Sequence, residues 1–242
     1  MANQLYTIPQ AVEVFVHAFS EGKSRTYPYL PSRVGDLYVM RDTPDRKNAR
    51  KIEVINHGVP PAQAQRDLED AGIGWHFICD IHAPDADYKA IRDEYKSLGY
   101  RALSTEWLFI HNLSNIPVFE SNPLVRQLSS QAEVDTIHQT VTQKRKFRDG
   151  TRMFCIADEE RDMGWVTSVP YQNAAWVSDL FVHRDLRGQG FGKALMSKLL
   201  QVDREVGVEQ SVLLASTDGA RIYPTMGYQQ IGILQMFCPV KR

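Results

Sequence analysis

Cysteine and long apolar runs are scarce in this chain. Its three cysteines, Cys79, Cys155 and Cys238, lie far apart, each within a short apolar segment. This number and spacing argue against a disulfide framework and against a zinc site, and predict buried strand thiols in a reducing compartment. No apolar stretch approaches the roughly 20 residues of a membrane-spanning helix. We therefore expect no disulfide, no metal and no membrane-embedded segment.

An excess of charge of either sign is also missing. The 242 residues carry a formal net charge of -1, which gives no electrostatic reason to expect binding to nucleic acid or to an anionic membrane. The basic run at residues 144–148 is short, and we interpret it as a solvated helix end or loop. Residues 1–4 lack the basic and then apolar pattern of a secretion signal, so a cytoplasmic location is expected.

The most informative feature of the chain is a glycine-rich segment that follows an apolar strand pattern. The apolar residues 180–182 lead into a short charged turn, then into Gly188, Gly190 and Gly192, and then into an amphipathic helix. Glycines at a helix start leave backbone N–H groups free of side-chain bulk, and such groups bind phosphate. The segment therefore predicts a site for a phosphorylated cofactor, although glycine-rich turns also occur for packing alone.

Two common phosphate-binding motifs do not fit this segment. A P-loop has the pattern Gly-x-x-x-x-Gly-Lys followed by Ser or Thr. With Gly192 and Lys193 as the Gly-Lys pair, the hydroxyl position is occupied by Ala194 and the first glycine position by Arg187. A dinucleotide-binding fingerprint needs a third glycine where the chain has Lys193. The sequence therefore argues against both a nucleotide triphosphate and a dinucleotide.

The segment does fit the pattern Arg-x-x-Gly-x-Gly, through Arg187, Gly190 and Gly192. Downstream, residues 223–228 form a Tyr-x-x-x-Gly-Tyr sequence. With these motifs in this order, the last half of the chain resembles the GNAT superfamily of acyl-CoA-dependent N-acyltransferases. The resemblance implies an α/β fold, with a mixed central sheet flanked by helices.

By this resemblance, the glycine-rich segment wraps the pyrophosphate of coenzyme A, and the preceding strand pairs its backbone with the pantetheine arm. The amide of Phe181 would then polarise the thioester carbonyl. Ser216 stands where many members of the family have an asparagine that contacts the cofactor. The residues expected to bind acetyl-CoA or coenzyme A are Leu180, Phe181, Val182, Arg187, Gly188, Gln189, Gly190, Phe191, Gly192, Lys193 and Ser216.

Two residues are candidates for proton transfer. Tyr223 stands where the family often has a tyrosine that protonates the departing thiolate, and packing on a helix face is the alternative for it. Asp179 could draw a proton from the amine through a water, or could be a structural carboxylate. His183 is expected at the surface.

The two halves of the chain share a spaced pattern. Tyr95, Gly99, Tyr100 and Phe109 recur at identical offsets as Tyr223, Gly227, Tyr228 and Phe237. Four such matches could arise by chance or by duplication, and we interpret the pattern as a sign of two GNAT-like halves. The first half lacks Arg-x-x-Gly-x-Gly, and Pro60 and Pro61 remove two backbone donors at the corresponding turn. Turn-forming residues at 111–123 place the boundary between a degenerate domain, 1–114, and an acyl-CoA-binding domain, 115–242.

Hydrophobic periodicity predicts the elements of the second half. The expected helices and strands, in order, are a helix at 130–143, strands at 153–157, 164–168 and 175–183, a helix at 190–206 with Leu195, Leu199 and Val202 facing the core, a strand at 210–216, a helix at 218–226 and a strand at 228–238.

These observations predict an acetyl-CoA-dependent enzyme that transfers an acetyl or other acyl group directly to a primary amine of a small-molecule or peptide acceptor. The alternatives are a non-catalytic sensor or interaction module that binds coenzyme A, and a scaffold without a cofactor. The four tryptophans could line an acceptor pocket or belong to the core. Neither the acceptor nor the oligomeric state is indicated by the sequence.

Overall fold

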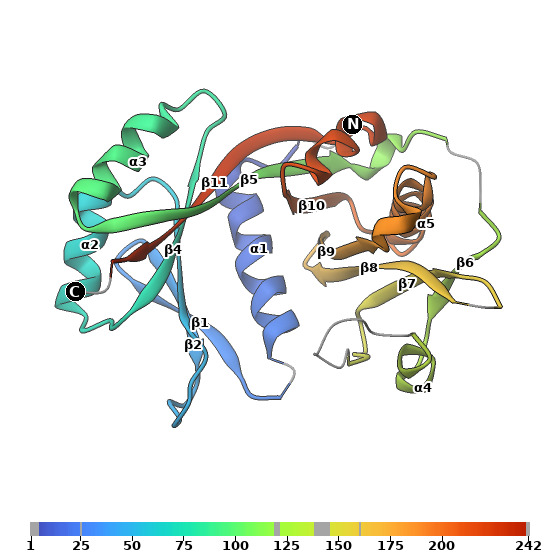
Figure 1. Ribbon diagram of the computed structural model, residues 1–242, viewed down its shortest axis with the longest axis horizontal. Coiled ribbons are helices and arrows are strands. Elements are labelled where there is room, and N and C mark those ends of the chain that lie inside the picture. Colours follow the sequence, from blue (N-terminus) through green and yellow to red (C-terminus); the bar gives the residue numbers. More distant parts are fainter. Residues whose placement is uncertain (1–4, 25, 119–121, 138–145, 160, 241–242) are drawn as a thin grey trace. The chain divides into compact units, whose positions relative to one another are not determined.

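The computed structural model describes residues 5–24, 26–118, 122–137, 146–159 and 161–240, which form both helices and strands (Figure 1). The helices are α1 (Ile8–Lys23), α2 (Pro61–Asp70), α3 (Tyr88–Ser97), α4 (Gln131–Asp135) and α5 (Phe191–Glu205), with short 3-10 turns at Leu113–Asn115, Arg184–Leu186, Gly219–Arg221 and Tyr223–Met226. The strands are β1 (Tyr29–Val34), β2 (Leu37–Asp42), β3 (Ile52–Asn56), β4 (His76–His82), β5 (Tyr100–Asn112), β6 (Val125–Leu128), β7 (Arg152–Ala157), β8 (Asp162–Tyr171), β9 (Ala174–Val182), β10 (Gln210–Ala215) and β11 (Gln229–Pro239).

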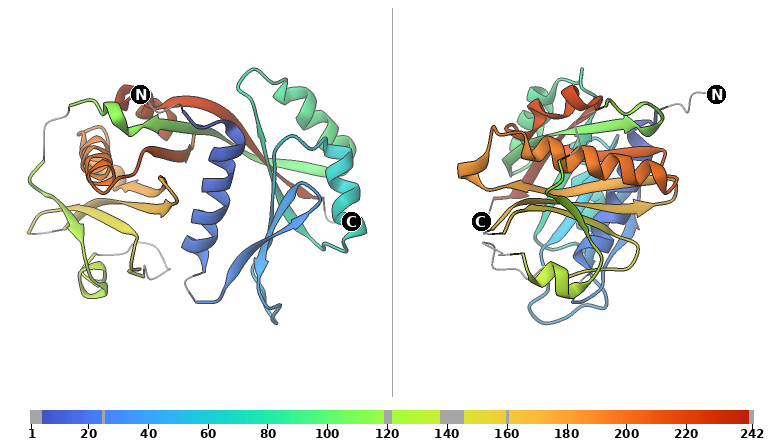
Figure 2. Two further views of the ribbon diagram at one scale, coloured as in Figure 1. Left: turned by 180° about the vertical axis from the view of Figure 1, so that it is seen from behind. Right: turned by 90° about the vertical axis from the view of Figure 1, so that its right-hand side faces the viewer.

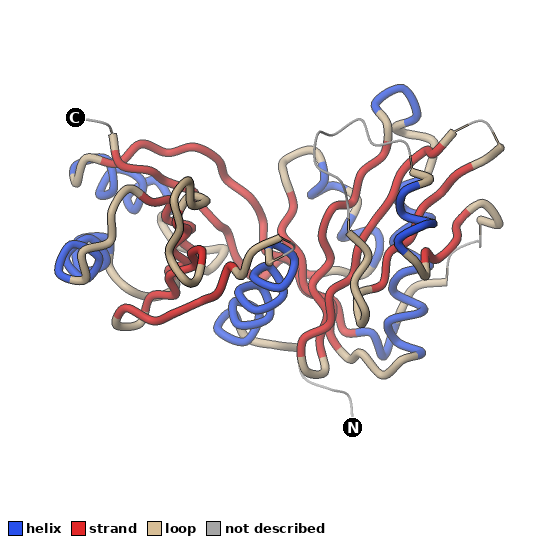
Figure 3. Tube along the Cα trace, turned by 90° about the horizontal axis from the view of Figure 1, so that it is seen from below, coloured by secondary structure: helices blue, strands red, loops and turns tan. Residues whose placement is uncertain are grey.

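The chain folds into two compact units. The N-terminal unit comprises chiefly Tyr6–Phe109, Leu214–Ala220 and the residues from Gln230 onward, and the C-terminal unit chiefly Ile110–Leu213 and Arg221–Gln229. Each unit contains hydrogen-bonded strands, red in Figure 3, and helices, blue in the same view. The predicted mixed α/β architecture, a central sheet flanked by helices, is confirmed.

In the N-terminal unit the strand order is β1-β2-β3-β4-β11-β5. β3 and β4 are parallel and pair over five consecutive positions, from Ile52 opposite His76 to Asn56 opposite Asp80. α2 and α3 cover one face of these strands and α1 the other (Figures 1 and 2). The core is apolar and includes the stacked rings of Tyr95 and Phe237, whose centroids are 4.1 Å apart.

In the C-terminal unit the order is β10-β9-β8-β7-β6, and the end of β5 lies beside β10. The pairs from β9 to β6 are antiparallel, whereas β9 and β10 are parallel. α5 lies on one face of these strands and α4 on the other (Figures 1 and 2). Trp165, 1% exposed, is the largest side chain of the core on the α4 face, where it shares a cluster with Val134.

The last strands of the two sequence halves are exchanged. β11, from the second half, pairs antiparallel with β4 of the first half, with Gln235 opposite Asp80. β5, from the first half, ends beside β10 of the second. The compact units therefore do not divide the chain at a single position, and the boundary at 114/115 stays a prediction about sequence halves.

The predicted elements are largely present. The strands expected at 153–157, 164–168, 175–183, 210–216 and 228–238 are confirmed as β7 to β11, with ends shifted by up to three residues. The helix expected at 218–226 is instead two 3-10 turns, because Pro224 and Gly227 leave too few residues for a regular helix. Of the helix expected at 130–143, the structure describes α4, and residues 138–145 lie outside the described residues, with part of the basic run.

The cysteines lie in buried strands, as predicted. All three cysteines are free and buried, in β4, β7 and β11. No described helix has the length and apolar character needed to cross a membrane. Within the described ranges, no group of three or more His, Cys, Asp or Glu side chains is placed to hold a metal ion.

Candidate functional site

The glycine-rich segment connects β9 to α5 through a left-handed turn. Gly188 and Gly190 have φ angles of +80° and +87°, and Gly190 is the N-cap of α5. A side chain is strained in this conformation, which explains both glycines. A Cβ at either position would have no heavy atom within 4 Å. The turn therefore leaves open space beside its backbone at the start of the helix.

The start of α5 has the character of an anion site. The first amides of a helix have no carbonyl partner within that helix, and the helix dipole makes this end positive. The first turn holds no acidic residue and does hold Lys193. Arg187 closes the turn, because its Nε donates to the carbonyl oxygen of Val182 at 3.2 Å. The predicted cofactor-binding residues Arg187–Lys193 are thus brought together at one helix end.

The strand before the turn bends away from its parallel neighbour. β9 pairs with β10 at only three positions, which end with Trp176 opposite Val212. Beyond them β9 carries a bulge, because Thr167 pairs with Ser178 while Trp165 pairs with Phe181. Asp179 lies at this bulge with a φ of +59°. Bulges bend a strand and increase its twist, and the following residues, Leu180–Val182, are half-buried.

An aromatic cluster supports the bent part of β9 from behind. The rings of Trp165 and Phe181 are stacked with centroids 4.4 Å apart. His183 packs edge-on against both rings, and its Nε2 lies 3.2 Å from Oδ2 of the buried Asp162. The expectation that His183 is a surface residue is therefore wrong, since only 19% of its side chain is exposed. The side chain of Phe181 belongs to the core, as its proposed backbone role allows.

Gly164 is a residue of this site that the sequence reasoning missed. It lies on β8 opposite Val182, and a Cβ there would be 2.3 Å from the carbonyl oxygen of Phe181. An isolated glycine within a strand pattern signals close backbone approach, so the signal was present in the sequence. Gly164 sets the distance between β8 and the residues expected to face the cofactor.

We expect Gly164→Ala to lower the free energy of unfolding by about 1–3 kcal/mol, because the added methyl group must push β8 and β9 apart. Chemical denaturation measures this effect. Gly192→Ala is the matched control, since a Cβ there would make only ordinary contacts of 3.7 Å with Ile222 and Val182. A Gly164→Ala variant as stable as Gly192→Ala would contradict the close approach.

Tyr223 lies beside the start of α5. The neighbouring Ile222 places its Cδ1 3.7 Å from where a Cβ of Gly192 would be. Tyr223 itself is 5% exposed and packs edge-on against Tyr228, with centroids 5.5 Å apart. Burial raises the pKa of Tyr223 to about 12, so its phenol stays protonated throughout the neutral range. The structure thus gives Tyr223 a packing role and leaves a proton on its oxygen.

The remaining predicted residues are placed differently. Asp179 is exposed at the bulge. Ser216 belongs to the N-terminal unit, where its exposed Oγ accepts a hydrogen bond from the amide of Gly219 at 3.4 Å. The roles expected for both residues stay predictions.

A buried ionic network anchors the other end of α5, and the sequence reasoning did not find it. The Asp203 carboxylate is fully buried and binds Nε of Arg152 on β7, and Oγ of Ser168 on β8 donates to it at 2.7 Å. The sequence predicted Val202 as the core-facing residue of this turn, but Val202 is half-buried and its neighbour Asp203 is fully buried. Asp203 can be buried because Arg152, 51 positions earlier in the chain, is its partner. Hydrophobic periodicity does not reveal partners that lie so far apart.

At the corresponding turn of the N-terminal unit the two parallel strands do not part. β3 and β4 stay paired along all five positions. The amide of Val59 is already bonded to Oδ1 of Asn56 at 3.2 Å, and α2 begins with Pro60 as N-cap and Pro61 as first residue. This turn therefore presents fewer amides to an anion than the turn before α5.

Comparison with known proteins finds a family match within the second half of the chain. Residues 149–230 match the family model described as an acetyltransferase (GNAT) domain. No curated protein matches the chain at a significant level.

The whole chain also resembles solved GNAT structures. A GCN5-related N-acetyltransferase from Kribbella flavida superposes with a TM-score of 0.67 at 16% identity, over 96% of each chain. A GCN5-related N-acetyltransferase-like protein from Streptococcus suis has a TM-score of 0.56 at 12% identity, covering 96% of this chain and 98% of that one. One from Sphaerobacter thermophilus has a TM-score of 0.53 at 14% identity, covering 84% and 76%. These likenesses show that the GNAT fold extends over both units.

Proposed function

We propose that the protein is an N-acyltransferase that uses acetyl-CoA as co-substrate and transfers the acetyl group directly to a primary amine. The observation that carries the proposal is the parting of β9 from β10 just before an open, left-handed glycine turn at the start of α5. The free edge of β9 and the start of α5 follow one another in the chain, so together they suit an extended ligand that ends in a phosphate group.

The residues present fit coenzyme A. Gly188 and Gly190 leave room beside their backbone, the amides of residues 191–193 suit a pyrophosphate, and Arg187 and Lys193 add positive charge. When bound, the cofactor supplies a thioester that is already activated for acyl transfer. The amide of Phe181 on bent β9 is proposed to polarise the thioester carbonyl as an oxyanion-type donor.

Two side chains are proposed to handle protons. The Tyr223 phenol would hold the proton needed by the thiolate leaving group, and its raised pKa keeps that proton in place at neutral pH. Asp179, exposed at the bulge, would accept the proton of the amine through a water. The N-terminal half of the sequence, residues 1–114, is proposed as a degenerate GNAT-like half that contributes to recognition of a small-molecule or peptide acceptor.

Titration calorimetry with acetyl-CoA tests the cofactor site. We expect Gly190→Trp to weaken binding roughly ten- to thirtyfold, which corresponds to losing one hydrogen bond to a charged group, about 1.5–2 kcal/mol. Gly58→Trp is the matched control in the N-terminal unit, because Gly58 has a similar φ of +86° and equally open surroundings. Both variants carry similar backbone strain, and only Gly190→Trp alters the proposed site.

The outcomes separate enzyme from binding module. Equal weakening in both variants, or no binding by the unaltered protein, would reject the cofactor site. Binding without transfer to any of a broad set of amines would reject the enzyme and leave a coenzyme A-binding module. Transfer of a labelled acetyl group to an amine, lost in Gly190→Trp and kept in Gly58→Trp, would establish the activity.

A further inference from the structure

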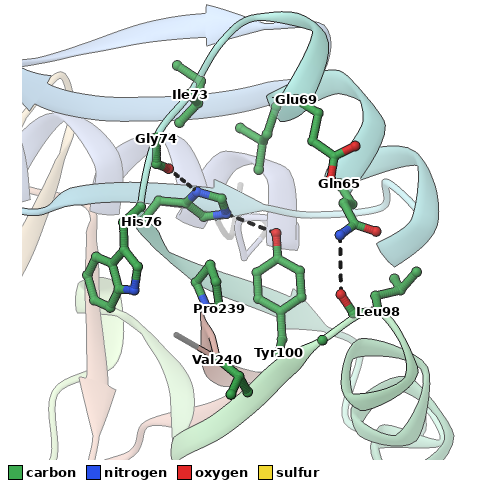
Figure 4. A pocket seen from close by; sticks show the side chains of 12 residues that line it. Gln65, Glu69, Ile73, Gly74, His76, Leu98, Tyr100, Pro239 and Val240 are labelled. Carbon is green, nitrogen blue, oxygen red and sulfur yellow. Dashed lines mark hydrogen bonds between the residues drawn. The ribbon is translucent and has the colours of Figure 1, made fainter. Parts of the chain in front are cut away.

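The N-terminal unit has a cavity of its own, of about 400 Å³. It lies between the C-terminal ends of α2 and α3, the starts of β4 and β5, and the last residues of β11 (Figure 4). β3 and β4 run parallel, and the cavity borders the start of β4. The turn that corresponds to the glycine turn of the GNAT domain instead follows the end of β3, so the cavity is not a degenerate copy of the cofactor site.

Electrostatics in this cavity favour a cation. Among the described residues that line it, Glu69 is the one with a full charge. Glu69 is exposed at the end of α2, and the described residues provide no hydrogen-bond or ion-pair partner for its carboxylate. The C-terminal ends of α2 and α3 both border the cavity, and this end of a helix carries negative potential. The cations closest in sequence on the two helices, Arg66 on α2 and Lys96 in the last turn of α3, are not part of the lining.

The polar groups in the wall have fixed hydrogen-bonding roles. Nδ1 of buried His76 lies 2.7 Å from the carbonyl oxygen of Gly74, which can only accept, so this nitrogen carries the proton. Burial lowers the pKa of His76, which keeps the ring neutral. Its Nε2 must then accept the hydrogen bond from the Tyr100 hydroxyl at 3.0 Å (Figure 4). The phenolic oxygen of Tyr100 is left as an acceptor for a ligand N–H group.

Trp75 supplies an aromatic wall. Its indole Nε1 is buried and has no hydrogen-bond partner among the described residues. One face of the ring is covered by the Lys51 ammonium, 4.7 Å from its centroid, and Lys51 is not part of the lining. The apolar side chains of Leu68, Ile73 and Leu98 complete the wall.

We propose that this cavity binds a small protonated organic amine with an apolar body, held by the Glu69 carboxylate and the Tyr100 oxygen. An anion such as a nucleotide or phosphate ester is disfavoured by Glu69 and by both helix ends. The cavity volume suits a ligand of modest size. The inference concerns the N-terminal unit and stands whether or not the GNAT domain binds acetyl-CoA.

Three matched probes test the charge preference: 2-phenylethylamine, the neutral 2-phenylethanol and the anionic phenylacetate. Binding is followed through the indole N–H resonances in two-dimensional NMR, with that of Trp75 identified by its loss in Trp75→Phe. We expect the amine to shift this resonance with a dissociation constant on the order of 1 mM, as suits a ligand of about nine non-hydrogen atoms. Phenylacetate is expected to bind at least roughly tenfold more weakly.

Two variants locate the charge. Glu69→Gln should weaken binding of 2-phenylethylamine roughly three- to fivefold, as expected for an exposed ion pair. Asp70→Asn is the matched control, because Asp70 ends the same helix and does not line the cavity. The proposal is overturned if the amine causes no shift at 10 times that concentration, if phenylacetate binds as well as the amine, or if both variants weaken binding equally.

Discussion

Replacing Arg152 with leucine is expected to lower the free energy of unfolding by about 3–5 kcal/mol, because it leaves the Asp203 carboxylate buried without its cation. Asp203 is fully buried, and Arg152 and Ser168 are its bonded partners. Denaturant unfolding of the variant and the unaltered protein at pH 7 measures the difference.

The dependence of this loss on pH follows from the direction of the pKa shift. Burial raises the pKa of Asp203, and Arg152 and Ser168 partly offset the rise. Without Arg152 the pKa rises further, so the protonated form is favoured more strongly in the folded state. A raised carboxyl pKa contributes stability at low pH that is lost as the pH rises from the unfolded to the folded pKa. The loss in Arg152→Leu should therefore be smaller near pH 4 than at pH 7.

Two further variants control this experiment. Arg161→Leu removes the partner of Asp185 in an exposed ion pair, whose side chains are 48% and 61% exposed, and should leave stability unchanged within error. Adding Asp203→Asn to Arg152→Leu should restore part of the loss, because no buried charge then remains. A loss as large in Arg161→Leu, or no restoration in the double variant, would contradict the account.

Replacing Tyr223 with phenylalanine is expected to reduce acyl transfer roughly 100-fold, the lower end of the range for general acid catalysis. The lower end is chosen because burial raises the pKa of Tyr223 to about 12, which makes its phenol a weaker acid than free tyrosine. Since the packing of the ring against Tyr228 is kept, the melting temperature should change little. Steady-state rates with a labelled acetyl group measure the effect on kcat.

The dependence of kcat on pH provides a second test of the role of Tyr223. With a pKa of about 12, its deprotonation should cause no fall in kcat between pH 8 and 10. Tyr95→Phe is the matched control, because Tyr95 is the equivalent tyrosine of the half of the sequence that lacks Arg-x-x-Gly-x-Gly, and it should keep its turnover. A fall in kcat near pH 10 that is absent from Tyr223→Phe would contradict the raised pKa, and unaltered turnover in Tyr223→Phe would remove its catalytic role.

Local features of the site could be predicted from the sequence, because they follow from neighbouring residues. Gly188 and Gly190 predicted a turn at a helix start, and both have positive φ angles there. The bulge at Asp179 could not be predicted in this way: aspartate is among the non-glycine residues enriched at positive φ, but most aspartates do not adopt it, so the residue type alone does not indicate a bulge. Asp203 also escaped prediction, because its burial depends on Arg152, far away in the sequence.

The repeat was visible in the sequence, but its consequence for strand pairing was not. Tyr95 and Phe237 come from different copies of the shared pattern, yet their rings stack in one core. Equivalent residues in the two copies of the pattern have similar sequence neighbours, so local sequence patterns do not distinguish one copy from the other. Only the long-range pairing of β11 with β4 decides which partner is used, and hydrophobic periodicity carries no information about it.

The exchanged strand also has a consequence for biosynthesis. On the ribosome, β4 emerges long before β11, its antiparallel neighbour, has been translated. Until then β4 has an unpaired edge on that side, and unpaired edges recruit strands from other chains. The N-terminal unit therefore completes its sheet only after β11 has left the exit tunnel. Stalled or truncated nascent chains are expected to depend on chaperones that shield this edge.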